Sequence, residues 1–194
     1  LTAEIGLWGY DPTPADPFVL NHRNFPRSTM LGDASLVLGA LVGGPGTTTV
    51  ACLGGAQIDR HGNINSTVVP DGPFLVGSGG GNDVASVADE SVVVALLQPE
   101  RTPPECGYVT SPGRSVRALV TDLGLLEKAD DDELVLVAVP AGDTPIAARV
   151  AAAQAACGWD LRVAATVAEL ALPTREELGA LRRWDPRGWF LRAR

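Results

Sequence analysis

Leu134-Val135-Leu136-Val137-Ala138-Val139 opens the stretch of sequence that decides the fold. An apolar run without polar alternation predicts a strand that is covered on both faces. The Ala-rich segment from about Pro145 to Cys157 has the composition of a helix, and Leu161 to Ala164 predicts the next strand. Strands that alternate with a helix in this way are typical of α/β proteins. We therefore expect an open, mostly parallel sheet flanked by helices.

The segments on the N-terminal side extend this pattern. Further strands are predicted at Thr47–Leu53, Val92–Gln98 and Val116–Thr121, with a shorter extended piece at Ile64–Val69. A helix is predicted over Ser35–Val42, where Asp33 is a candidate cap. The last predicted helix, Thr174 to Arg183, has Glu177 three residues after Thr174, as in a capping box. No internal repeat or low-complexity linker interrupts the sequence, so we expect one domain over residues 1–194.

The composition excludes several classes of partner. With 23 Asp and Glu against 15 Lys and Arg, the formal net charge of −8 repels a phosphate backbone and argues against nucleic-acid binding. No apolar run approaches the roughly 20 residues that span a bilayer, so we expect no membrane segment. Three Cys and two His show no metal-ligand spacing. We therefore expect buried free thiols, no metal site and a cytoplasmic location.

The first segment with candidate chemistry lies close to the start of the chain. Glu4-Ile5-Gly6-Leu7-Trp8-Gly9 is an E-x-G-x-x-G placed where a strand is predicted to end. A carboxylate there stands at the edge of a sheet where ligands usually bind, and the two glycines allow a sharp turn. A Glu beside two Gly is also typical of a solvated turn. The chain begins with Leu1, without Met or a polar lead-in, so we expect that an N-terminal segment is missing.

The second segment runs from Leu53 to Thr67 and contains G-x-Q-x-D-x-x-G-N-x-N. His61-Gly62-Asn63 predicts a hairpin-like turn, because Gly and Asn tolerate a positive φ. A turn does not account for Gly54-Gly55-Ala56-Gln57. Small residues followed by an amide indicate a close backbone approach and a polar contact beyond it.

The third segment is Val76-Gly77-Ser78-Gly79-Gly80-Gly81-Asn82-Asp83-Val84. Its glycines precede a predicted helix and leave several N–H groups free to point at one anionic centre, either a phosphate or an oxyanion. No Lys-Ser/Thr pair follows, so this is not a Walker loop. A flexible surface loop is the alternative interpretation of this segment alone.

The order of the three segments resembles a known family. They are followed by Tyr108–Gly113 and Val120–Gly124, and in this order they resemble the β subunit of family I CoA-transferases, in particular the glutaconate CoA-transferase type. The resemblance runs from residue 4 to the Pro173–Pro186 region. It implies the CoA-transferase (NagB/RpiA-like) fold. The β subunits of the family carry an additional N-terminal strand and helix, which fits the expected missing start.

The resemblance implies that Glu4 is the nucleophile, with Gly6 and Gly9 completing its turn. In the family the carboxylate attacks an acyl-CoA thioester and forms an acyl-glutamyl anhydride. The released CoA thiolate then forms a glutamyl-CoA thioester, from which a second carboxylic acid takes the CoA. A carboxylate is a weak nucleophile, yet its anhydride and thioester open easily, so one difficult exchange becomes several feasible steps.

The remaining site residues follow from the same resemblance. Backbone N–H groups of Gly79, Gly80 or Gly81 are expected to stabilise the oxyanion or bind CoA. Gln57 and Asn63 are expected to shape the site. The acyl-CoA thioester is then a substrate, no cofactor is bound permanently, and an α subunit is the expected partner in a heterodimer or heterotetramer.

Two other readings stay open. Some members of the superfamily lack the glutamate and hydrolyse carbon rings of CoA thioesters, and their β subunits share the D-R-x-G-N-x-N segment found at Asp59–Asn65. Glu4 argues against a ring-opening hydrolase without excluding one, because an anhydride that admits water is hydrolysed. A non-catalytic subunit that senses a ligand or binds a partner is the second alternative, since the wider fold group includes regulatory domains.

Overall fold

The structure is a computed structural model that describes residues 1–3, 5–11, 13–14 and 21–189. Its internal contacts divide the chain into two compact units. The first unit comprises Leu1–Pro45 with Leu172–Arg194, and the second comprises Gly46–Ala171. Each unit is described by itself below. The expected single domain over residues 1–194 stays a prediction.

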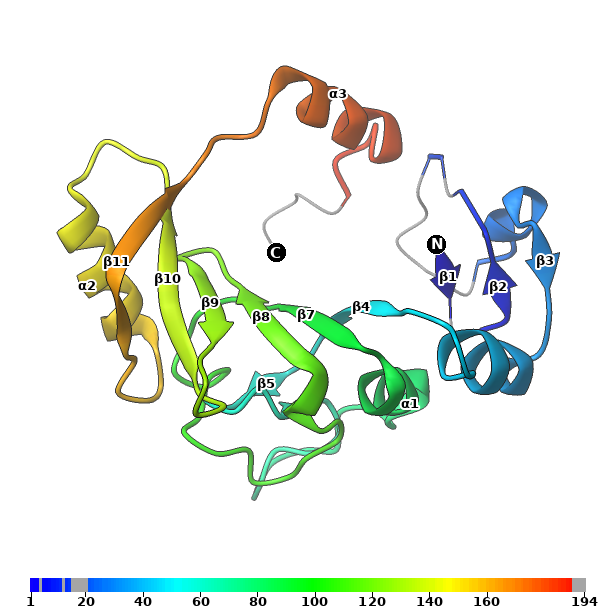
Figure 1. Ribbon diagram of the computed structural model, residues 1–194, viewed down its shortest axis with the longest axis horizontal. Coiled ribbons are helices and arrows are strands. Elements are labelled where there is room, and N and C mark those ends of the chain that lie inside the picture. Colours follow the sequence, from blue (N-terminus) through cyan, green and yellow to red (C-terminus); the bar gives the residue numbers. More distant parts are fainter. Residues whose placement is uncertain (4, 12, 15–20, 190–194) are drawn as a thin grey trace. The chain divides into compact units, whose positions relative to one another are not determined.

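A six-stranded sheet forms the second unit, in the order β11-β10-β9-β8-β7-β4 (Figure 1). Its strands are β4 (Val50–Gly54), β7 (Glu90–Val94), β8 (Val116–Val120), β9 (Leu125–Lys128), β10 (Leu134–Pro140) and β11 (Val163–Leu170). The pairs β4–β7, β7–β8 and β10–β11 are parallel, whereas β9 runs antiparallel to both of its neighbours. The predicted α/β fold with an open, mostly parallel sheet is confirmed.

Two helices connect parallel neighbours in this sheet. Helix α1 (Gly79–Val87) lies between β4 and β7 in the chain, and α2 (Ile146–Ala156) lies between β10 and β11. Both crossovers run in the same direction across the sheet, so right-handed connections place both helices on one face. Figure 1 shows them on the same side. The strands were expected to be covered on both faces; within this unit the helices cover one face, and Val50, Val94 and Val120 are exposed.

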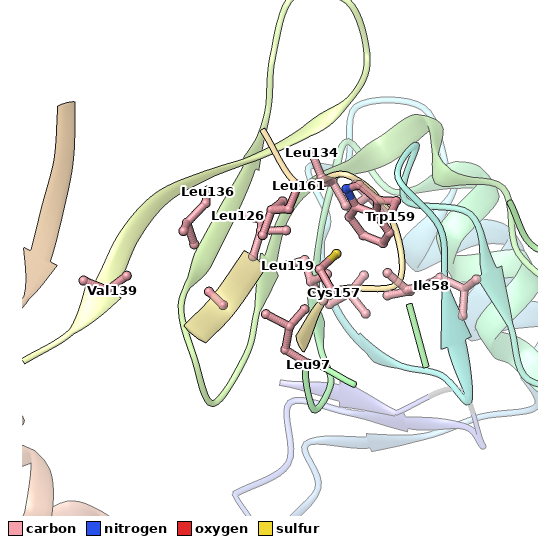
Figure 2. Close-up of a cluster of buried hydrophobic side chains, with 14 residues drawn as sticks. Ile58, Leu97, Leu119, Leu126, Leu134, Leu136, Val139, Cys157, Trp159 and Leu161 are labelled. Carbon is pink, nitrogen blue, oxygen red and sulfur yellow. The ribbon is translucent and has the colours of Figure 1, made fainter. Parts of the chain in front are cut away.

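The core of the second unit lies on the helix-covered face. Figure 2 shows the cluster of buried side chains, in which Leu119, Leu126 and Leu136 from β8, β9 and β10 meet Trp159 and Leu161. All three strand leucines are fully buried. Burial of each contributes about 1.5–3 kcal/mol. The cluster also includes Ile58 and Ile64, so it packs the sheet against the segment that contains the Asp59–Asn63 turn.

The predicted elements differ from the observed ones mainly at their ends. Helix α2 and strands β8 and β10 lie where the sequence predicts them. The predicted buried strand Thr47–Leu53 is instead β4, an edge strand with Val50 62% exposed. Strand β9 was not predicted. Two short strands, β5 (Gln57–Ile58) and β6 (Ile64–Asn65), pair antiparallel, which confirms the hairpin-like turn between them.

The first unit is built from short elements. Strands β1 (Thr2–Ala3), β2 (Leu7–Trp8) and β3 (Met30–Leu31) form an antiparallel sheet, and the chain also contains a 3₁₀ helix (η1, His22–Arg27), a helix with π-type turns (η2, Ser35–Val42) and helix α3 (Arg175–Trp184). The Asp33 carboxylate accepts a hydrogen bond from the Leu36 N–H at 2.7 Å, as predicted. The capping box of Thr174 and Glu177 is also confirmed.

The three thiols are free, but only one of them is buried. Cys157 lies in the core, Cys106 is half-buried and Cys52 is exposed on β4, so the expectation of buried thiols is wrong for Cys52. Across the described ranges, no helix combines the length and the apolar character that a membrane crossing requires.

Candidate functional site

The expected nucleophile, Glu4, lies outside the described residues. The glycines that follow it are described, and each has a local reason to be glycine. Gly6 has φ +106°, and a Cβ there would lie 2.0 Å from the Gly32 carbonyl oxygen. Gly9 has φ +60°, and its Cβ would lie 2.6 Å from Thr29 Oγ1. Gly6, between β1 and β2, and Gly9, just after β2, therefore allow the chain to pack closely against the residues on either side of β3.

The Asp59–Asn63 turn is organised around one buried carboxylate. Asp59 is 2% exposed, and its Oδ1 accepts from the backbone N–H groups of His61 and Asn63, both at 3.0 Å. Its Oδ2 accepts from Asn63 Nδ2 at 3.0 Å and from the Cys106 N–H at 3.1 Å. Gly62 completes the turn with φ +79°. Four hydrogen bonds thus stabilise the buried charge, so this part of the motif maintains the loop.

The two expected site-shaping side chains lie in one hairpin, and both are held by hydrogen bonds. Asn63 donates to Asp59 and accepts from the Gly113 N–H at 2.9 Å. Gln57 accepts from Asn65 Nδ2 at 2.9 Å and donates to the Glu100 carbonyl at 3.1 Å. Their amides therefore fix the backbone of the loops around them. Their part in a substrate site stays a prediction.

Asn65, the last residue of the motif, is completely buried and was not predicted as important. Its Nδ2 donates to Gln57 and to the Val68 carbonyl, and its Oδ1 accepts from the Thr67 and Val68 N–H groups. Thr110 Oγ1 accepts from the Ser66 N–H at 2.9 Å. In the sequence, the N-x-N spacing of Asn63 and Asn65 is the pattern that could have marked Asn65. The segments around residues 66 and 110 are consequently held side by side.

The glycine segment forms the first turn of α1, where the sequence predicted a loop ahead of a helix. Gly79 has φ +53°, and the preceding Ser78 makes no side-chain capping hydrogen bond. The first N–H groups of an α-helix have no acceptor within the helix and carry partial positive charge. Gly79, Gly80 and Gly81 therefore place donors at a helix start that the Ser78 side chain does not cap.

Gly81 has no reason within the described fold to be glycine. Its φ lies outside the left-handed region, and a Cβ there would meet nothing within 4 Å. Glycine in a helix costs about 0.5–1 kcal/mol relative to alanine. Gly55 differs, because its Cβ would lie 2.4 Å from the Ile64 side chain, which explains the close approach predicted there. The space beside Gly81 is open to a molecule outside the chain.

Two titratable side chains near the turn were missed by sequence reasoning. Burial, and secondarily the Asp59 carboxylate, raises the pKa of the Cys106 thiol to about 12. Its Sγ donates to the Asn63 carbonyl at 3.4 Å. Lys128, with a side chain 5% exposed, donates to the Gly113 carbonyl at 2.7 Å. Burial lowers the pKa of Lys128 despite the opposing charge of Asp132. Neither residue carries a motif that would have marked it.

In the first unit, the guanidinium of Arg27 is engaged by hydrogen bonds within the chain. Arg27 donates to Asp11 Oδ2 at 2.6 Å and to the Thr13 carbonyl at 3.0 Å. In the described parts of the chain, no group of three or more His, Cys, Asp and Glu is placed to hold a metal ion.

Comparisons with known proteins show what the chain resembles. No family model matches the sequence. The β subunit of 3-oxoadipate CoA-transferase from Pseudomonas knackmussii is 34% identical over 163 residues, which cover 73% of this chain and 60% of that protein. The chain thus spans less than two thirds of the length of this curated relative.

Solved structures extend the likeness to nearly the whole chain. Glutaconate coenzyme A-transferase from Acidaminococcus fermentans matches with a TM-score of 0.83 and 24% identity, over 98% of this chain and 80% of that chain. The decarboxylase AibA/AibB matches with a TM-score of 0.78 and 19% identity, over 95% and 76%. At such identities the likeness shows the fold alone, and the fold is shared by proteins named for two different reactions. Together with the sequence match, these findings show that the chain resembles the β subunit of a CoA-transferase in sequence and glutaconate coenzyme A-transferase in fold.

Proposed function

We propose that this chain is the glutamate-bearing subunit of a CoA-transferase that moves CoA between an acyl-CoA and a carboxylic acid. The sequence similarity to the β subunit of a CoA-transferase supports the reaction class. The observation that carries the proposal is the start of α1, where Gly81 leaves open space beside uncapped N–H groups. A developing oxyanion needs such preorganised donors, and a fold that needed only stability would favour alanine at Gly81.

In the proposed reaction Glu4 is the nucleophile. One of its carboxylate oxygens attacks the thioester carbonyl carbon, the C–S bond breaks, and CoA leaves as a thiolate. The thiolate attacks the glutamyl carbonyl of the resulting anhydride, and the first acid leaves as a carboxylate. An acceptor carboxylate then attacks the glutamyl-CoA thioester, which forms a new anhydride and releases the CoA thiolate. The thiolate attacks the acceptor's carbonyl carbon in this anhydride, which yields the new acyl-CoA and returns the free Glu4 carboxylate. No net proton transfer is required.

The helix start supplies the electrostatic part of the proposal. Every step passes through a tetrahedral centre that carries an oxyanion. Backbone N–H groups of Gly79, Gly80 or Gly81 are assigned to this charge, and the partial positive charge of the helix start adds to their effect. Gln57 and Asn63 act indirectly by holding the loops in place. Removing one donor of this kind typically lowers kcat by about 10²–10³-fold.

A partner chain is part of the proposal. The curated relative is named as one subunit of its enzyme, which implies a second chain there. CoA is an anion, and a chain with a formal net charge of −8 needs local donors or a partner to bind it. We place the assembly in the cytoplasm, where free thiols such as the three found here stay reduced.

Kinetics of the assembled enzyme test the proposal. The exchange of CoA is measured from acetyl-CoA or succinyl-CoA to 3-oxoadipate or glutaconate, the acids in the names of the matched proteins. Glu4→Ala is expected to lower kcat by more than about a thousandfold, and Glu4→Asp to lower it less. The thermal unfolding midpoint should stay unchanged. Normal turnover by Glu4→Ala would remove Glu4 as the nucleophile.

The same assay separates the alternatives. A transferase needs an acceptor acid for turnover and passes CoA to it as a thioester, so it releases no free CoA, whereas a hydrolase releases a titratable thiol in buffer alone and a decarboxylase releases CO₂. The shared D-R-x-G-N-x-N segment does not favour the ring-opening hydrolase, because the side chains of Asp59 and Asn63 form hydrogen bonds that hold the loop itself. Thiol release at the rate of exchange, without an acceptor, would support hydrolysis instead.

A further inference from the structure

The Gly113–Ser115 turn (η3) contacts the Asp59–Asn63 turn on one side. Its first residue donates its N–H to Asn63 Oδ1 at 2.9 Å, and its carbonyl accepts from Lys128. A Cβ on Gly113 would lie 2.4 Å from the His61 carbonyl oxygen and 2.6 Å from the Asn63 nitrogen. Only glycine allows this backbone approach. The turn is therefore locked against the loop that holds Asn63.

On its other side η3 contacts the C-terminal end of α1. Ser115 Oγ donates to the Ala85 carbonyl at 2.9 Å, and Arg114 Nη2 donates to the Ser86 carbonyl at 3.3 Å. These carbonyls belong to the last turn of the helix, where no intrahelical N–H is available. The positive charge of Arg114 also interacts favourably with the C-terminal end of the helix dipole. Residues of η3 thus serve as the C-terminal cap of α1.

A second buried hydroxyl, that of Ser91, hydrogen-bonds to this cap. Ser91 Oγ and Ser115 Oγ are 2.9 Å apart, and the two residues are 0% and 5% exposed. Ser115 uses its single hydrogen on Ala85, so Ser91 must donate to Ser115. Ser91 lies on β7 and does not itself bond to the helix through this pair. The hydroxyl of Ser115 therefore links Ser91 of the sheet to α1.

The cap matters because α1 is short and weakly fixed at its other end. A nine-residue helix is about 13 Å long, and this one starts with three glycines and no side-chain cap. A shift at the C-terminal end is transmitted along such a helix to its first N–H groups. Catalytic donors act within tenths of an ångström, and a displacement of about 1 Å costs up to about a hundredfold in rate.

We propose that Ser115 is a positioning residue, which caps α1 from η3 and thereby holds the glycine start of the helix in place relative to the Asp59–Asn63 turn. The inference rests on the proposed function, in which N–H groups at that start stabilise an oxyanion. Ser115 itself touches no substrate. Its loss therefore weakens an interaction made in the transition state, and it acts on kcat with little effect on KM.

Three variants of the assembled enzyme test this role by CoA exchange. Ser115→Ala is expected to lower kcat by about tenfold or more, equivalent to about 1.4 kcal/mol, with KM within about twofold. Ser115→Thr keeps the hydroxyl and should restore kcat to within about threefold. Ser91→Ala is the matched control: it removes the other buried hydroxyl, leaves the Ser115–Ala85 bond in place, and should keep kcat within about twofold.

Amide hydrogen exchange in residues 79–87 is measured on the same variants and needs no substrate. Faster exchange in Ser115→Ala than in Ser91→Ala is expected. The inference would be overturned if Ser115→Ala left kcat or the rate of amide hydrogen exchange unchanged. It would also be overturned if Ser91→Ala lowered kcat as much as Ser115→Ala, or if a folded Ser115→Thr did not restore kcat. If Ser115→Ala does not fold, Arg114→Ala replaces it with the same expected split between kcat and KM. A wild-type assembly without CoA exchange refutes the proposed function, and hydrogen exchange still decides whether Ser115 holds α1.

Discussion

The variant Gly81→Ala tests separately what Gly81 contributes to stability and what it contributes to CoA exchange. The added Cβ would meet nothing within 4 Å, so the substitution creates no clash within the described fold. Alanine is better than glycine in a helix by about 0.5–1 kcal/mol, and the lower value applies to a first-turn position. For a chain of this size about 0.5 kcal/mol corresponds to a rise in Tm of about 1–2 °C. We therefore expect a more stable protein.

The activity should change in the opposite direction. A methyl group at Gly81 occupies the space into which a thioester oxyanion is proposed to approach. We expect kcat for CoA exchange to fall by about tenfold or more, within the range seen when one oxyanion donor is lost. Thermal unfolding by circular dichroism and exchange kinetics are measured on the same preparation.

Gly179→Ala is the matched control. Gly179 lies inside α3, where a Cβ would meet only Arg183 Nη1 at 3.6 Å, an ordinary contact. It should raise Tm by a similar amount without affecting exchange. A Gly81→Ala protein less stable than wild type would show that the helix start is not open. A stabilised Gly81→Ala protein with unchanged kcat would show that no substrate approaches it.

Three further predictions concern stability and reactivity. Asp59→Asn places an NH₂ group against the donors that the carboxylate serves, and should lower the free energy of unfolding in urea by about 2–4 kcal/mol; a loss under about 0.5 kcal/mol would contradict the network. At pH 8 iodoacetamide should alkylate the exposed Cys52 well before Cys157 and Cys106. The pKa of Cys106, about 12, leaves a thiolate fraction of about 10⁻⁴ at this pH. In urea all three thiols should react at similar rates. The hydrogen bonds from Thr174 lower the pKa of Glu177 below its ordinary 4.5. The contribution of Glu177 to the free energy of unfolding is therefore present above pH 4.5 and is lost as the pH falls through the lowered pKa. In unfolding experiments, Glu177→Gln should be less stable than wild type at neutral pH and equal to it in strong acid.

The fold was predictable where the signal is local. Helix α2 follows from an Ala-rich segment, and β10 from an uninterrupted apolar run. Strand β9 was missed because Leu125–Lys128 is short and carries two charged residues. The exposure of β4 was missed because the order of strands in a sheet is set by long-range pairing, and the local sequence does not record that an apolar strand lies at an edge.

The candidate site was predictable only in part. Glycines and asparagines in motifs mark Gly62 and Asn63, whose turn requires them. The sequence does not reveal that Ser115 meets Ala85, because the two residues are 30 positions apart and serine is common at turns. For the same reason Lys128 could not be assigned to the Gly113 carbonyl. Contacts between distant segments depend on the packing of the whole sheet.

Trapping the covalent intermediate decides whether Glu4 carries the reaction. The assembled enzyme is incubated with acyl-CoA, digested, and analysed by mass spectrometry. We predict a mass increase of one CoA on the peptide that contains Glu4, lost on treatment with hydroxylamine and absent from Glu4→Ala. Exchange that proceeds with no adduct on this peptide, or with a CoA adduct on another residue, would contradict the proposed glutamyl-CoA mechanism.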